Sequence, residues 1–515
     1  MFSVLFSKIK AKLMKNFLTL FLIFFVSVNS ASAQLSLPDT FTNNMVLQRG
    51  EPIHIWGNGI PNKSLKIEFG RDTIATAVRQ DSTWSVYFKK SKSNSSPQSI
   101  YISSGLERIV LSNILIGDVW LCAGQSNMEW SMEREMHFDK EKKNVNLPSL
   151  RFYNTTYAGK NIYNKSFNDS LLSLLNENDF YDGRWAVSDS ISIKRMSAVG
   201  YYFGKEILEQ VDVPIGLINM AIGGAPIEAF IGRNVMEGNS LFSSKVKGNW
   251  LDNNVLPEWI RERGHQNVGD IQVLDGDELG PNHAFKPGFA YSAGIKPLFK
   301  LPIKGIIWYQ GESNAQEIER VNEYGELQKL LIEDYRQKWK QPEMPFYWVQ
   351  LSSIDTTHYN SKYWPKFRDE QRELLNEIEN GGMAVSSDIG FINDVHPTNK
   401  KDVGYRLARW ALNKTYGKQI VPSGPLPITA KYIEGKIIID FAYTANGLKT
   451  SDNQVLRGFS IDGIELVPAK LCKHIVEVTS QYKPEYVYYG WQPFTDANLV
   501  NSENLPASTF KLKVN

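Results

Sequence analysis

The chain has 515 residues, more than the ~100–200 of an ordinary single domain, so we expect two or three domains. A hydrophobic fraction of 42% and an aromatic fraction of 12% exclude an intrinsically disordered chain. The formal net charge of +2 gives no marked basic excess, and no nucleic-acid partner is expected.

Residues 1–33 have the pattern of a secretory signal peptide. Four lysines precede the apolar run FLTLFLIFFVSV, and Ala31-Ser32-Ala33 offers small residues for cleavage. The run is shorter than the ~20 residues of a membrane-spanning helix, so no membrane insertion is expected after signal removal. Removal takes away four lysines and no acidic residue, which changes the formal net charge from +2 to −2. We therefore expect a bacterial protein that is periplasmic or secreted.

Residues 34–112 read as short strands separated by turn residues. Runs such as PIHIWGNG, SLKIEFG and TWSVYFKK end at Asn-Gly or Gly. Seven such runs within fewer than 80 residues predict an N-terminal β-sandwich.

Residues 113–420 change to strands that alternate with amphipathic helices. Strand-like runs include DVWLC, VPIGLINMA, IKGIIWYQ and PFYWVQL, and helical runs include EYGELQKLLIEDYRQKW and KKDVGYRLARWALNKTYG. This alternation predicts an α/β fold with a parallel sheet covered on both faces. Residues 131–184, rich in Asn, Ser and charge, are interpreted as an insertion over the sheet edge. Residues 421–515 return to short strands and predict a C-terminal β module.

The chain has two cysteines, Cys122 and Cys472, in segments of different character. Two buried free thiols are favoured over a disulfide bridge. Export with so few cysteines is more typical of a bacterial protein than of a disulfide-framed eukaryotic domain.

Three polar clusters directly follow predicted strands: GQSN at 124–127, Gly223-Gly224, and QGESN at 310–314. In parallel α/β sheets, binding sites form at the carboxyl ends of the strands. We therefore expect the three clusters to converge on one edge of the sheet.

Ser126 lies at a predicted strand-to-helix turn. Such a turn aims the hydroxyl outward and places the amide near free backbone donors, which is suited to a nucleophile. The alternative is a helix N-cap, since serine is a preferred cap. The segment GQSNM lacks the final glycine of the G-x-S-x-G elbow, which weakens an α/β-hydrolase assignment.

His396 is the best-placed base among the seven histidines. It lies in the loop between the last predicted strand and the closing helix, with Asp394 two residues earlier. The alternative is a merely exposed loop histidine. Five of the remaining histidines lie in the β modules, in a charged run or in polar loops: His54, His474, His137, His265 and His358. His283, in GPNHAF, is ambiguous.

An acyl-transfer site also needs donors for an oxyanion, and removing one typically costs ~10²–10³ in rate. Gly223 or Gly224 can offer a backbone N–H, and Gln310 or Asn314 a side-chain amide. A tight turn and an ordinary polar loop are the alternatives. The chain has no H-E-x-x-H, paired C-x-x-C or P-loop motif, so neither a metal nor a cofactor is expected.

Several phrases, in this order, resemble the sialate O-acetylesterase family of SGNH-type (GDSL-like) serine esterases: MVLQRG, GDVWLCAGQSNMEW, PIGLINMAIGGAPIEAF, IKGIIWYQGESNA, VHPTNKKDVGYRLA and LRGFSIDG. The resemblance covers nearly the whole mature chain. It implies a flavodoxin-like hydrolase domain with β modules around it.

The resemblance also implies roles for individual residues. Ser126 corresponds to the nucleophile and His396 to the general base, without a metal. The oxyanion hole is implied at the amide of Ser126, a Gly223-Gly224 amide and the side chain of Gln310. SGNH relatives commonly use an asparagine in a G-x-N-D block, and Gly311-Glu312-Ser313-Asn314 departs from that spacing, so Asn314 is the second choice after Gln310. The family acid usually stands three residues before the histidine, where this chain has Asn393. Asp394, Glu312 or a backbone carbonyl therefore stay open as the group that orients His396.

The resulting hypothesis is removal of O-acetyl groups from a sugar, with O-acetylated sialic acid first and acetylated xylan or pectin as the alternative. A cation placed for the sialate carboxylate would discriminate between them, and Arg233 is a candidate. A hypothesis of another class is a non-catalytic carbohydrate-binding protein. The sequence makes no prediction of the oligomeric state.

Overall fold

The structure is a computed structural model that describes residues 34–269 and 276–515. The expected signal peptide at 1–33 lies outside the described residues. Within them, no helix combines the length and the apolar character needed to cross a bilayer. The described chain forms two compact units, one from the segments up to Pro38, His54–Tyr87 and Ile100–Val110, and the other from the rest.

The smaller unit is built of antiparallel strands. β3 pairs with both β4 and β6, and β2 pairs with β5. Side chains alternate along β3, where Leu65 and Ile67 are buried and Lys66 between them is exposed, as expected for strands with one face on a core. The strands of this part of the chain are β2 (Ile53–Asn58), β3 (Ser64–Phe69), β4 (Asp72–Ala77), β5 (Thr83–Phe88) and β6 (Asn94–Ser104).

The larger unit contains a central sheet of order β15-β14-β13-β7-β10-β8-β9. From β10 to β15 the strands are parallel, and their chain order is the 2-1-3-4-5 order of flavodoxin-like sheets. This confirms the predicted α/β fold with a parallel sheet. The strands are β7 (Glu107–Gly124), β8 (Leu147–Tyr157), β9 (Tyr181–Ser188), β10 (Ile215–Asn219), β13 (Gly305–Tyr309), β14 (Phe346–Gln350) and β15 (Gly381–Val385), and β1 (Val46–Gln48) pairs with β7.

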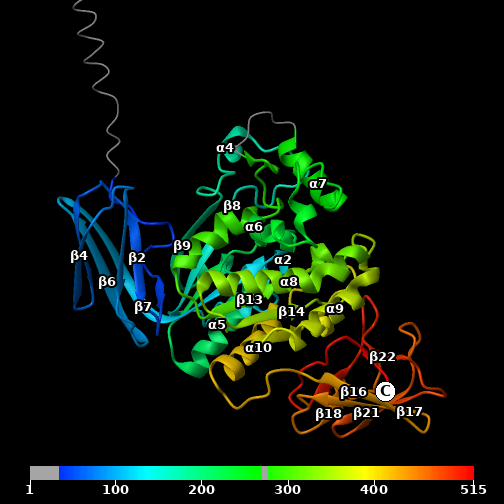
Figure 1. The fold of residues 1–515 in the computed structure, drawn as a ribbon. Coiled ribbons are helices and arrows are strands. Elements are labelled where there is room, and N and C mark those ends of the chain that lie inside the picture. The colour runs from blue at the N-terminus through cyan, green and yellow to red at the C-terminus, as the bar shows by residue number, and fades with distance from the viewer. Residues whose placement is uncertain (1–33, 270–275) are drawn as a thin grey trace, which may run out of the picture. The chain divides into compact units, whose positions relative to one another are not determined.

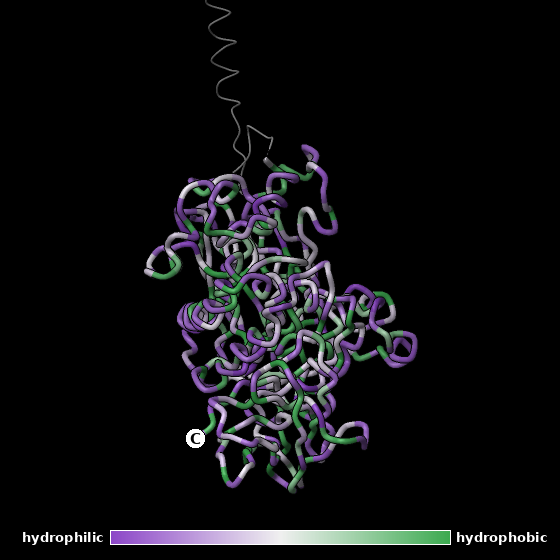
Figure 2. Tube along the Cα trace, turned by 90° about the vertical axis from the view of Figure 1, so that its right-hand side faces the viewer, coloured by the Kyte–Doolittle hydropathy of each residue, from purple (hydrophilic) through white to green (hydrophobic). Residues whose placement is uncertain are grey.

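The stretch 131–184, expected as an insertion over the sheet edge, supplies β8 and the first part of β9 to that edge. β8 runs parallel to β10 and β9 runs antiparallel to β8. Buried Leu150, Phe152 and Tyr153 stand among polar neighbours, so the strand was not recognised from composition. Figure 2 shows hydrophobic residues gathered in the interior, whereas many projecting loops are hydrophilic.

Helices cover both faces of the sheet. Consecutive side chains of β14 point to opposite faces: Trp348 donates from Nε1 to the Gln371 carbonyl on α9, and the Tyr347 hydroxyl bonds Thr415 just beyond α10. α5 packs along α10 and α8 along α9 (Figure 1). The helices are α2 (Ser126–Glu129), α3 (Phe138–Glu141), α4 (Asp169–Leu172), α5 (Ala198–Val211), α6 (Arg233–Glu237), α7 (Glu258–Gly264), α8 (Ile318–Trp339), α9 (Trp364–Glu373) and α10 (Lys400–Trp410).

Local sequence sets where α5 and α10 begin and how closely they pack. The Ser197 side chain accepts from the Gly200 amide and Asn399 accepts from the Asp402 amide, so both helices carry N-caps. A Cβ at Gly404 would lie 2.7 Å from the Val199 carbonyl oxygen, so only glycine permits this approach of α10 to α5.

The C-terminal residues form small, mostly antiparallel sheets around their own apolar core. The guanidinium of Arg368 on α9 is buried and donates to the carbonyls of Gly490, Gln492 and Pro493, which ties these strands to the central domain. The strands are β16 (Leu426–Ile433), β17 (Lys436–Ala442), β18 (Leu448–Thr450), β19 (Phe459–Ser460), β20 (Ala469–Cys472), β21 (Ile475–Thr479), β22 (Tyr486–Tyr489), β23 (Leu499–Asn501) and β24 (Phe510–Lys513); β11 (Gly276–Asp277) and β12 (Gly280–Pro281) form a short ribbon earlier in the chain.

Candidate active site

The polar clusters after β7, β10 and β13 meet at one edge of the sheet. The Gln125 amide donates to the Tyr309 carbonyl at 2.9 Å, and the Ile222 amide donates to the Gly124 carbonyl at 3.0 Å. Gly124 has φ +131°, and a Cβ there would lie 2.1 Å from the Tyr309 carbonyl oxygen. Glycine is therefore required where β7 passes β13. These two strands form the topological switch point of the sheet, because the connections that follow them run to opposite faces.

Ser126 is the first residue of α2, and the N-cap position belongs to Gln125. The Ser126 hydroxyl makes no capping bond; its Oγ lies 2.8 Å from His396 Nε2. The amides of Met128 and Glu129 donate to the Gln125 carbonyl, while the Ser126 amide has no acceptor among the described residues. The geometry thus departs from the N-cap alternative and leaves one backbone donor beside the hydroxyl.

His396 lies in the loop between β15 and α10. Its ring stacks on Trp130 with centroids 5.3 Å apart and an interplanar angle of 23°. Burial, followed by the positive charge of Lys400, lowers the pKa of His396 to about 4 against the opposing effect of Asp394. The imidazole is therefore neutral at pH 7, and the contact with Ser126 is consistent with an unprotonated Nε2 that accepts from the hydroxyl.

The acid that would orient His396 is loosely placed. The Asp394 carboxylate accepts from the His396 backbone amide at 2.8 Å, but its Oδ1 lies 3.5 Å from His396 Nδ1 and its side chain is 57% exposed. A separation of 3.5 Å is long for a strong hydrogen bond. Glu312, the other candidate, bonds Asn127 instead of His396.

The side-chain amides of Gln310 and Asn314 are held inside the protein. Gln310 Nε2 donates to Asn314 Oδ1 at 2.8 Å and to Gln125 Oε1 at 3.1 Å. Asn314 Nδ2 donates to Glu228 Oε2 at 3.1 Å. The amide donors of both oxyanion-hole candidates are therefore already hydrogen-bonded within the protein.

Gln125, which was not predicted as a site residue, has the opposite arrangement: its side-chain amide nitrogen is free within the described residues. Its Oε1 accepts from Gln310 Nε2 and from the amides of Gly311 and Ser313, at 3.1, 3.3 and 3.2 Å. Its Nε2 has no acceptor in the described part of the chain. The one sequence signal for a role of Gln125 was its position next to Ser126.

The two glycines after β10 also differ. The Gly223 amide donates to the Tyr157 hydroxyl at 3.1 Å. Gly224 has φ +75°, its carbonyl accepts from the Ser313 hydroxyl at 2.9 Å, and its amide has no acceptor within 34–269 and 276–515. Gly224 is therefore the glycine with a backbone donor to spare.

A buried polar network lies behind the Ser126–His396 pair. Asn127 Nδ2 donates to Glu312 Oε1 and, at 2.9 Å, to the Val395 carbonyl, and Asn127 Oδ1 accepts from Lys400 Nζ. Burial raises the pKa of Glu312 and lowers the pKa of Lys400 to about 7, against the opposing effect of Glu312. Neither Asn127 nor Lys400 was predicted as a site residue from the sequence; the lysine four residues after His396 was the available signal.

Arg233 is already neutralised. It lies 2.7 Å from Glu237, 2.8 Å from Glu278 and 3.5 Å from Asp277. Two other arginines flank the site on aromatic rings: the Arg134 guanidinium lies 3.7 Å from the Trp130 ring centroid and that of Arg263 lies 4.7 Å from the Tyr163 centroid. Neither has a carboxylate partner among the described residues.

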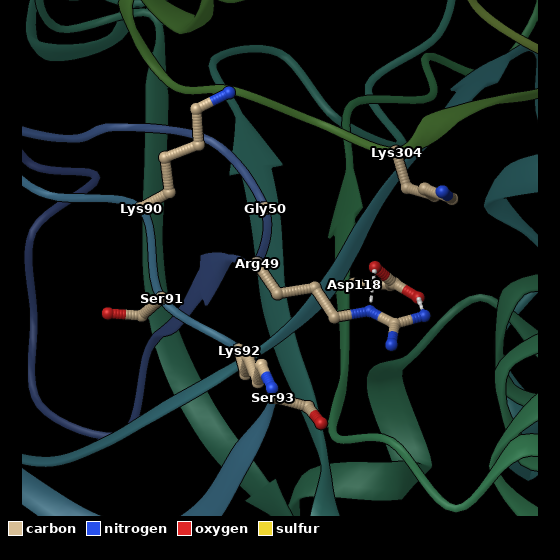
Figure 3. Close-up of a pocket in the computed structure, with 8 residues that line it drawn as sticks. All are labelled: Arg49, Gly50, Lys90, Ser91, Lys92, Ser93, Asp118 and Lys304. Atoms are coloured by element: carbon tan, nitrogen blue, oxygen red, sulfur yellow. Dashed lines mark hydrogen bonds and ion pairs between the residues drawn. The ribbon is translucent and has the colours of Figure 1, made fainter.

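Three further features bear on the chemistry. A hollow of about 490 Å³ lined by Arg49, Lys90, Lys92 and Lys304 lies at the opposite, amino-terminal end of the strands, where Arg49 pairs with Asp118 (Figure 3). The described residues contain no group of three or more His, Cys, Asp or Glu arranged to hold a metal ion. Both cysteines are free, and burial raises the pKa of the Cys122 thiol.

The chain is also similar in sequence and fold to known proteins. A family model described as "Carbohydrate esterase, sialic acid-specific acetylesterase" matches residues 116–249 and 290–413. Sialate O-acetylesterases of Pongo abelii and Homo sapiens are 29% and 28% identical over 451 and 449 residues, in each case 80% of this chain and 77% of the relative. The crystal structure of a carbohydrate acetylesterase from Xanthomonas citri is 26% identical, with a TM-score of 0.76 over 93% of this chain and 100% of that one.

Proposed function

The chain belongs to the sialic acid-specific acetylesterase family and is a carbohydrate O-acetylesterase, and on that premise we propose that it acts through an acetyl-enzyme on Ser126. The observation that carries the proposal is the 2.8 Å contact between Ser126 Oγ and His396 Nε2 at the carboxyl end of β7. The family membership and this contact disfavour the non-catalytic carbohydrate-binding hypothesis. Export through the segment 1–33 is part of the proposal.

In the proposed reaction, His396 Nε2 takes the Ser126 proton while Oγ attacks the acetyl carbonyl carbon. The tetrahedral intermediate then collapses: the bond to the sugar oxygen breaks, and the imidazolium returns its proton to that oxygen. Water then gives a proton to the same imidazole and attacks acetyl-Ser126; the bond to Oγ breaks, acetate leaves, and the imidazolium returns the proton to Ser126 Oγ. The neutral His396 favoured by burial is the form that starts each half-reaction.

The oxyanion hole is proposed to consist of the amides of Ser126 and Gly224 and the side-chain Nε2 of Gln125. These donors have no acceptor among the residues that the structure describes, whereas those of Gln310, Asn314 and Gly223 are engaged. Gln310 and Asn314 are assigned instead to holding the Gln125 amide in place, since preorganised donors stabilise a developing charge without reorganisation.

Gln125→Glu should lower kcat by about 10²-fold, because it keeps the side-chain volume and an acceptor oxygen but replaces the Nε2 donor. Acetate release at saturating substrate is the measurement. Gln419→Glu makes the same chemical change at an exposed position and should retain the wild-type kcat. A normal kcat for Gln125→Glu would show that the third donor of the oxyanion hole is another group.

O-acetylated sialic acid is the proposed substrate, since the flanking arginines suit a carboxylate. The Tyr163 hydroxyl lies 3.7 Å from where a Cβ would stand on Gly223, and Arg263 and Gly223 line the same hollow. Arg134 reaches the site through Trp130, which stacks on His396. Arg134 and Arg263 each lie on an aromatic ring and have no carboxylate partner among the described residues. They replace Arg233, the candidate from the sequence, as the cations that would bind the sialate carboxylate.

Acetate release from O-acetylated sialic acid, acetylated xylan and acetylated pectin tests the substrate. We expect release from the first, and the plant-polysaccharide alternative prevails if only the polymers are cleaved.

Arg263→Gln should raise KM for O-acetylated sialic acid by about tenfold or more, because a charge-assisted hydrogen bond is lost. The KM for 4-nitrophenyl acetate, which has no carboxylate, should stay unchanged. Arg233→Gln is the matched control and should leave both values at the wild-type level. Equal changes for the two substrates would contradict a carboxylate-binding role.

A further inference from the structure

Lys400 has no part in the reaction steps above, yet it is among the most deeply buried charged residues near the site. Its side chain is 0% exposed and has no ion-pair partner within 4.0 Å among the described residues. Its Nζ donates to Asn127 Oδ1 and lies 5.5 Å and 5.6 Å from the ring centroids of Trp130 and Tyr309. Burying an ammonium with so little compensation is costly, so its retention calls for a role.

The contacts of Asn127 indicate that role. Asn127 follows Ser126 in the chain, and the Val395 carbonyl to which it donates precedes His396. Its amide orientation is determined, because the nitrogen faces a carbonyl and the Glu312 carboxylate while the oxygen faces the ammonium of Lys400. One side chain therefore connects the turn of the serine to the loop of the histidine, and Lys400 and Glu312 hold it from opposite sides.

In a Ser-His-Asp arrangement, the acid normally holds the histidine. Here the Asp394 side chain is 57% exposed and 3.5 Å from the imidazole, whereas the Asn127 network is buried. We propose that Lys400 is a positioning residue, and this proposal rests on the proposed Ser126–His396 reaction. Together with Glu312, Lys400 fixes Asn127, which keeps the histidine loop bonded to the serine turn. Lys400 also places a positive charge near the imidazole.

The charges that act on His396 predict opposite effects for two substitutions. Apart from burial, Lys400 and Arg134 lower the pKa of His396, and Asp394 raises it. Trp130 contributes an uncharged ring, and Ser126 a hydroxyl. Removing Lys400 should therefore raise the pKa of the imidazole, and removing the charge of Asp394 should lower it.

The test is the pH profile of kcat/KM for 4-nitrophenyl acetate, whose acid limb reports the free-enzyme imidazole. Lys400→Met should lower kcat about tenfold or more and move that limb to higher pH by about one unit. Asp394→Asn should move the limb to lower pH. Lys401→Met, which changes the exposed neighbouring lysine, should leave the limb and kcat unchanged.

Lys400→Gln separates the two parts of the role, since it offers Asn127 an amide donor but no charge. It should shift the limb as Lys400→Met does, with a smaller loss of kcat. The limb midpoint does not depend on how much of a variant is folded, so poor folding does not remove the readout. A lower kcat with an unmoved limb for both Lys400 variants would overturn the positioning role, whereas full activity of a Ser126→Ala enzyme would overturn the underlying serine mechanism instead.

Discussion

Ser126→Ala is expected to lower acetate release by about 10⁴-fold or more, leaving only the contribution of substrate binding and the oxyanion donors. The Ser126 hydroxyl contacts His396, and its loss removes that hydrogen bond. The fold should survive, because Ala is a good helix former and Ser126 does not cap α2. The two measurements are acetate release from O-acetylated sialic acid and the thermal unfolding midpoint of each enzyme.

A matched control for this change is Ser451→Ala, at an exposed position in the C-terminal part of the chain. It should keep the wild-type rate. Rapid denaturation during turnover and mass spectrometry should find an acetyl group on the peptide that contains Ser126 in the wild type and not in Ser126→Ala. Residual activity within tenfold of wild type would instead require a different nucleophile.

The central sheet could be predicted because its strands are buried on both faces and therefore read as continuous apolar runs. IIWY of β13 and FYWVQ of β14 are examples. β8 was not recognised, since its buried Phe152 and Tyr153 are followed by Asn154, Thr155 and Thr156, and a strand near the sheet edge tolerates such polar residues.

Some residues of the site could likewise be chosen from the local sequence, whereas others depend on tertiary contacts. Ser126 and His396 could be selected from their places after strands, and the structure brings them to 2.8 Å. The choice between Gln125 and Gln310 depends on which amide has acceptors nearby, and that is decided by residues up to 188 positions apart. Arg233 was a reasonable cation in sequence, but three acidic neighbours neutralise it in space.

His396→Ala is expected to reduce kcat/KM by about 10³–10⁵-fold, because the same imidazole serves acylation and deacylation. The wild-type rate should be lost as the pH falls through the His396 pKa of about 4, since only the neutral ring accepts the serine proton. The variant should lack that limb, and its residual rate should rise with pH, because hydroxide then replaces the imidazole as the base. The measurement is kcat/KM for 4-nitrophenyl acetate from acid to mildly alkaline pH.

Asp394→Asn provides the contrast that gives the His396 result its meaning. With Asp394 at 3.5 Å and largely exposed, its loss should reduce kcat by no more than about tenfold, far less than the ~10⁴ typical of a buried triad aspartate. Together the two variants would describe a Ser-His pair whose histidine is held mainly by the buried Asn127 network and the Trp130 ring. A 10⁴-fold loss for Asp394→Asn would show that the carboxylate closes on the imidazole when substrate binds, and the aspartate would then rank as a full member of a triad.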